Sequence, residues 1–125
     1  MGDRVVIQFK TADGEVSPVI YGHWAGEAAP AAIARLYDRM RGRPDDIEYV
    51  AARYLQELGM TDATSAGFGI WNAPPHGEMD QSDSHGDAGC FVVTIGPKWH
   101  VRQFAGYPPK IPDTPGITWE CVAPA

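Results

Sequence analysis

Residues 4 to 24 contain the pattern that most restricts the fold of this chain. Two runs rich in β-branched and aromatic residues, RVVIQFK and SPVIYGHW, flank the turn sequence TADGEV. An Asp–Gly pair between such runs, here Asp13–Gly14, is a strong signal for a β-hairpin. The first run alternates between two sets of side chains, so we expect one of its faces to be buried. The sets are Val5, Ile7 and Phe9 on one face and Val6, Gln8 and Lys10 on the other.

Two amphipathic helices are expected after the hairpin. Pro30 suits the first turn of the first helix, where its missing N–H has no helical partner. The apolar stripe of that helix comprises Ile33, Leu36, Tyr37 and Met40. Pro44 breaks the helix, Asp45 can cap the next one, and Gly59 is expected to end it. The two helices are expected to form an antiparallel pair.

The remaining sequence favours β-structure. GFGIWN, CFVVTI and WHVRQF are expected to be strands, and ITWECV can add a last one after the proline-rich segment YPPKIPDTPG. The order β-β-α-α-β-β-β predicts an α+β fold, in which an antiparallel sheet carries the helix pair on one face. At 125 residues, the chain 1–125 is expected to be a single domain.

Composition narrows the function classes. The net charge of −6 argues against general nucleic-acid binding through phosphate contacts. The sequence has no apolar run long enough to span a membrane and no secretory signal at its start, so we expect a cytoplasmic protein without membrane contact. Cys90 and Cys121 are expected to be reduced thiols packed in the core.

The loop PPHGEMDQSDSHGDAGC, residues 74–90, is the densest group of polar side chains. His76, Asp80, Asp83, His85 and Asp87 are all residue types that bind zinc, manganese or iron, and the candidate metal ligands among them are His76, Asp83, His85 and Asp87. The loop lacks the H-E-x-x-H spacing of a zincin helix. It does not fit an EF-hand either, because His85 stands where the EF-hand requires glycine. The alternative is a solvated acidic surface loop.

Aromatic residues form a second candidate site. Tyr21, His23 and Trp24 end the hairpin and can form a recognition surface or line a pocket, or Trp24 can close one end of the core. Further aromatic surface is expected from Trp71, Trp99, His100, Tyr107 and Trp119. A chain of this size does not easily bury four tryptophans, so some are expected at an edge or interface.

Enzyme motifs give little support for catalysis. The sequence contains no G-x-S-x-G elbow and no P-loop. A Cys–His pair of Cys90 with His85 or His100 is an alternative, but the apolar residues 91–93 indicate that Cys90 enters the core.

The stretch VIYGHWAG resembles an IYxHWxG signature found in small uncharacterised proteins of phages and mobile elements. The matched residues are Ile20, Tyr21, His23, Trp24 and Gly26. The chain departs from the pattern at Ala25, Glu27 and Ala28, where such proteins often have an Asp and a Tyr–Pro pair. The resemblance implies a phage or mobile-element accessory protein and brings no catalytic residues with it.

The first functional hypothesis is a small acidic, non-enzymatic interaction protein without a cofactor, such as an inhibitor, that binds another macromolecule, most simply a protein. Its expected binding residues are Tyr21, His23, Trp24, Asp80, Asp83 and Asp87. A homodimer is compatible with the aromatic surface. The alternatives are a metal-dependent hydrolase or metal-binding protein with a divalent ion in the 76–87 loop, and a small-ligand sensor with a pocket near Tyr21.

Overall fold

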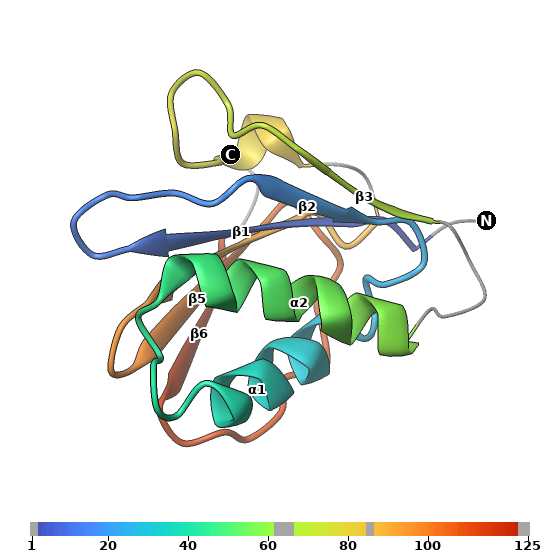
Figure 1. Ribbon diagram of the computed structural model, residues 1–125. Helices are drawn as coiled ribbons and strands as arrows, with labels where there is room; N and C mark the ends of the chain where they lie inside the picture. The colour runs from blue at the N-terminus through green and yellow to red at the C-terminus, as the bar shows by residue number, and fades with distance from the viewer. Residues whose placement is uncertain (1–2, 62–66, 85–86, 123–125) are drawn as a thin grey trace.

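The computed structural model describes residues 3–61, 67–84 and 87–122. Within these residues, six strands, two helices and one 3-10 turn follow one another along the chain (Figure 1). The elements are β1 (Val5–Thr11), β2 (Val19–Gly22), α1 (Ala29–Arg39), α2 (Ile47–Thr61), β3 (Phe68–Trp71), η1 (Gln81–Asp83), β4 (Cys90–Ile95), β5 (Trp99–Phe104) and β6 (Ile117–Val122). None of the helices in this part of the chain is both long enough and apolar enough to cross a membrane.

The strands form one sheet in the order β3-β2-β1-β4-β5-β6. The predicted α+β class is confirmed, and so is the hairpin, because β1 and β2 pair antiparallel. The prediction of a purely antiparallel sheet is wrong, since β4 is parallel to β1 and β6 is parallel to β5. Hairpin signals identify only neighbouring antiparallel strands. They do not reveal that the chain returns from β3 at the edge to place β4 beside β1.

Both helices cover one face of the sheet, as expected from their apolar stripes (Figure 1). Ile33, Leu36 and Met40 are fully buried, and Pro30 lies in the first turn of α1. The prediction that Gly59 ends the second helix is wrong, because α2 continues to Thr61.

A buried carboxylate joins the two helices. Glu57 of α2 accepts a hydrogen bond of 2.9 Å from Arg35 Nε and another from Arg39, both on α1. Burial alone would raise the pKa of Glu57, but the two guanidinium groups outweigh this effect and hold it below its usual value. The arginines of α1 therefore serve helix packing.

The second face of the sheet is covered as well. The segment between β3 and β4, which contains η1, lies on this side (Figure 1). Gln8 and Val6 of β1 are therefore buried, contrary to the expectation of a single buried face. Gln8 fixes the segment in place: its Nε2 donates to the Ser17 and Gly77 carbonyls at 3.1 and 3.0 Å, and its Oε1 accepts from the Met79 N–H at 2.7 Å.

Two further expectations about individual side chains need correction. Cys90 is buried as predicted, but Cys121 on β6 is exposed, because that strand forms the sheet edge. Trp99 adds no surface: it is buried in the core, where its indole N–H donates to the Pro44 carbonyl at 2.9 Å.

Candidate interaction surface at the β3 edge

Four rings from β2, β3 and the residues after β2 lie next to one another, and we call them the aromatic row: Trp71, Tyr21, His23 and Trp24. Tyr21 stacks on Trp71 with ring centroids 5.6 Å apart, because the β2–β3 register places both side chains on the second face of the sheet. The Tyr21 hydroxyl lies 2.8 Å from His23 Nδ1. His23 contacts Trp24 edge-on with a centroid distance of 4.6 Å. The structure thus places the three residues predicted as a candidate site next to Trp71, which the sequence predicts only as further aromatic surface.

Large apolar side chains are exposed along the same edge. Trp24 is 49% exposed, Phe68 38%, Ile70 52% and Trp71 45%. Phe68 and Ile70 point to the helix side of β3, and Trp71 points to the opposite side, because side chains alternate along a strand. A strand that exposes apolar residues on both of its faces is unusual in a surface without a partner.

The backbone of β3 is open on its outer side. The His23 N–H donates to the Gly67 carbonyl at 2.6 Å. Since hydrogen-bonded pairs alternate along an antiparallel ladder, Gly69 and Trp71 also face β2, whereas Phe68 and Ile70 direct their N–H and C=O groups outward. β3 is the last strand of the sheet, so within the described residues no strand pairs with these groups.

The opposite edge, β6, is protected by charge. Its Glu120 lies 3.1 Å from His100 Nε2 and 3.8 Å from Arg102 Nε on the neighbouring strand. Charged side chains on an edge strand discourage pairing with another chain. β3, with the sequence FGIW, has neither a charged residue nor a proline. The two edges of one sheet therefore differ in the feature that normally prevents strand addition.

Two of the predicted acidic binding residues are engaged within the loop itself. Asp80 and Asp83 form a capping box around η1, in which the Asp80 N–H donates to Asp83 Oδ2 at 2.9 Å and the Ser82 N–H donates to Asp80 Oδ1 at 2.9 Å. The hydrogen bonds from the Ser82 side chain and backbone lower the pKa of Asp80.

Asp87 lies apart from that capping box and closes the far end of the segment. Its Oδ2 accepts from the Arg4 N–H at 2.8 Å and from Arg4 Nε at 3.2 Å. Both bonds lower the pKa of Asp87, and the backbone bond contributes more than the side-chain bond. The predicted metal set is thus only partly assembled: His76 and Asp83 are close, Asp87 is engaged with Arg4, and His85 lies outside the described residues.

A different trio does come together. His76 Nε2 lies 3.6 Å from Asp80 Oδ2 and 3.4 Å from Asp83 Oδ2, and one ligand atom from each residue lies within 4.8 Å of the others. Imidazole and carboxylate groups suit zinc or manganese. Sequence spacing alone did not select this trio, because Asp80 enters it only through the turn at η1.

Cys90 does not have the environment of a nucleophile. It is fully buried, and its thiol lies 3.5 Å from the Asp80 carbonyl. Burial, together with the negative charges of Asp83 and Asp80, raises the pKa of Cys90 to about 12. The reactive form, the thiolate, is therefore strongly disfavoured near neutral pH.

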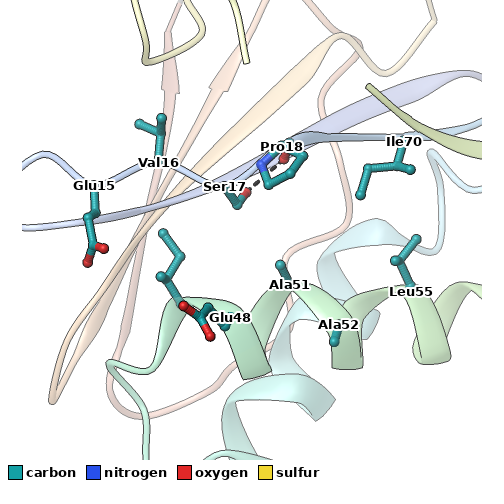
Figure 2. A pocket seen from close by; sticks show the side chains of 10 residues that line it. Glu15, Val16, Ser17, Pro18, Glu48, Ala51, Ala52, Leu55 and Ile70 are labelled. Carbon is teal, nitrogen blue, oxygen red and sulfur yellow. Dashed lines mark hydrogen bonds between the residues drawn. The ribbon is translucent and has the colours of Figure 1, made fainter. Parts of the chain in front are cut away.

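A groove of about 380 Å³ lies between α2 and the chain that leads into β2 (Figure 2). Its lining comprises Glu15, Val16, Ser17, Pro18, Ile47, Glu48, Ala51, Ala52, Leu55 and Ile70. None of the three residues predicted for a sensor pocket, Tyr21, His23 and Trp24, lines it. Because Ile70 belongs to β3, this groove is instead continuous with the open edge of the sheet.

The open edge at Phe68, Gly69 and Ile70 is not predicted by the sequence, in which GFGIWN indicates only a strand. The available signal was the absence of charge in FGIW. That absence has meaning only once the strand is known to be an edge.

No protein-family model matches the chain, and no curated protein or solved structure matches it.

Proposed function

We propose that this chain is a non-enzymatic interaction protein that binds an extended segment of another protein along the outer edge of β3. In this mode the partner segment adds a strand to the sheet. Its backbone would bond with the outward N–H and C=O groups of Phe68 and Ile70, and its side chains would contact the apolar residues of the edge. The observation that carries the proposal is the uncharged edge strand with apolar side chains exposed on both faces.

The aromatic row supports the same proposal. Trp and Tyr are the residues that most often contribute large binding energies at protein interfaces. Trp24 and Trp71 are both exposed, and the stacking of Trp71 on Tyr21 limits the rotamer freedom that binding would otherwise remove. The acidic loop is less suited to this role, because Asp80, Asp83 and Asp87 already have partners within the chain.

An accessory or inhibitor role in phages or mobile elements is part of the hypothesis, and its support is the resemblance at residues 20–26. The cytoplasmic location is likewise a prediction from the sequence. Neither affects the test of binding at β3.

A displayed library of random peptides tests the proposal. We expect the wild-type protein to enrich peptides with alternating apolar residues, and Ile70→Lys to weaken their binding about tenfold or more, because the lysine would place an unpaired charge in the interface. The control is Thr118→Lys, which introduces the same charge at an exposed position of the opposite edge strand. Failure to enrich any peptide, or equal binding by the Ile70→Lys variant, would contradict the proposal.

A second candidate function is binding of a divalent cation by His76, Asp80 and Asp83, favoured by the convergence of their ligand atoms. We expect Zn²⁺ or Mn²⁺ to bind with a stoichiometry of one, and His76→Ala to abolish binding, as measured by calorimetry and elemental mass spectrometry. His100→Ala is the control, since His100 pairs with Glu120 of the edge strand β6 and belongs to no group of converging ligand atoms among the described residues. The absence of stoichiometric binding would exclude this candidate.

A further inference from the structure

The groove beside β3 has two chemically different ends. Figure 2 shows Ile70 and Leu55 at one end, and Glu15 and Glu48 at the other. Between them, Ala51 of α2 and the Pro18 ring contribute small apolar surfaces. A groove of this volume falls within the range of sites that take up ligand groups.

The groove forms where β3 ends and residues 15–18 lie at the edge of the sheet. β3 ends at Trp71, which pairs with Val19, so within the described residues no strand lies outside residues 15–18. Pro18 has no N–H to offer a partner. Residue 18 therefore offers a partner no backbone donor, whereas a partner along β3 can use the outward N–H groups of Phe68 and Ile70.

The acidic end carries uncompensated charge. Glu15, on the hairpin, and Glu48, in the first turn of α2, are both exposed, and neither forms an ion pair with a described residue. Glu78, by contrast, is paired with Lys10 at 2.5 Å. A basic side chain of a partner would therefore meet two unpaired carboxylates at this end of the groove.

We propose that the groove receives the part of the partner segment that follows its β3-bound strand, with an apolar side chain between Ile70 and Leu55 and a lysine or arginine between Glu15 and Glu48. This inference rests on the proposed function and specifies its partner: an extended peptide segment that is apolar and carries a basic residue. The chain's net charge of −6 adds a long-range attraction for such a partner.

Two displayed peptide libraries test the inference. Both consist of alternating apolar and random positions, and they differ only in one terminal position, fixed as lysine in the first and as glutamate in the second. We expect wild-type protein to enrich lysine peptides at least threefold over glutamate peptides in low salt. This preference should decrease at 0.5 M salt, where charge interactions are screened.

The double variant Glu15→Gln, Glu48→Gln should lose the preference for lysine while still binding peptides. The matched control, Glu27→Gln with Asp113→Asn, removes the same total charge from exposed positions elsewhere and should retain the preference. Because all four side chains are exposed, these isosteric changes are expected to leave the fold intact.

The outcomes separate the two proposals. Equal enrichment of both libraries, with binding still lost in Ile70→Lys, would overturn the inference about the groove and leave binding at β3 in place. A preference for lysine that survives the double glutamate variant would also overturn it. If neither library is enriched, both proposals fail. A wild-type dimer in sedimentation that Ile70→Lys converts to monomer would assign the edge and groove to a second copy, and would overturn the basic segment as partner.

Discussion

The 76–87 loop and the β3 edge present opposite kinds of surface. The loop is rich in ionisable groups, but Asp80, Asp83 and Asp87 are engaged by Ser82, by the backbone and by Arg4. β3 has no ionisable group, yet Phe68 and Ile70 expose both their side chains and their outward backbone groups.

The comparison shows that the residue types in a segment do not tell whether their polar groups are free to bind a partner. Polar groups indicate a site only when their hydrogen bonds and charges are not already satisfied within the fold. An uncharged strand attracts no notice in the sequence, but as an edge it leaves backbone groups and apolar surface open to a partner. We therefore expect changes in the loop to alter stability, and changes at β3 to alter binding.

The largest effect is expected from Gln8→Leu, which removes the anchor of the loop. The variant leaves the buried Met79 N–H and the buried Ser17 carbonyl without this partner, so we expect the free energy of unfolding to fall by about 3 kcal/mol. Urea denaturation measures the change, with exposed Gln81→Leu as control, expected within about 0.5 kcal/mol of wild type. An unchanged stability of Gln8→Leu would mean that the loop is not held as described.

The next effect is a difference in thiol reactivity, which tests whether Cys90 at the end of the loop is nucleophilic. With its pKa raised to about 12 by burial, Cys90 should react with iodoacetamide at pH 8 at least about 100-fold more slowly than exposed Cys121. Mass spectrometry of peptides from briefly labelled protein gives both rates. Comparable labelling of the two thiols would restore Cys90 as a candidate nucleophile.

A smaller effect is expected at the aromatic row. Trp24→Ala should weaken binding of a peptide selected on wild-type protein about tenfold, because an exposed tryptophan next to the edge contributes contact area to the complex. Fluorescence polarisation measures the dissociation constant. Tyr49→Ala, which truncates a similarly exposed ring on α2, is the control and should bind normally. Equal losses in both variants would remove the aromatic row from the interface.

The smallest effect is expected from Asp87→Asn, and it depends on pH. The pKa of Asp87 is lowered in the folded state, so its ionised form stabilises the protein above the ordinary aspartate pKa of about 3.9, and this contribution is lost as pH falls through the lowered value. The variant should therefore be less stable than wild type at pH 7 and approach it at the acid end. Denaturation midpoints across this range measure the difference. A difference that persists unchanged to pH 2 would contradict a role for the charge.

The sequence predicted what depends on local patterns. The hairpin at Asp13–Gly14, the two helices and the buried stripe of α1 follow from turn chemistry and periodicity, and the structure confirms them. The α+β class follows from the order of these elements. The exposed position of Trp24 agrees with the expectation that some tryptophans lie at an edge.

The sequence did not reveal what depends on strand order. The parallel β1–β4 pairing, the second buried face with Gln8, and the position of β3 at the edge arise only when distant segments meet. The same holds for the His76, Asp80 and Asp83 trio, which the capping box of η1 assembles. The candidate site was therefore predictable in its aromatic residues and not in its edge strand.

The most direct test of binding at β3 is an NMR titration of the labelled full chain with the highest-affinity peptide from the library. We expect chemical-shift changes centred on Phe68–Trp71 and the Trp24 indole, with slowed hydrogen exchange at the Phe68 and Ile70 amides as they gain strand partners. Changes confined to the 76–87 loop, with the β3 amides unaltered, would contradict this expectation and return the binding site to the acidic residues.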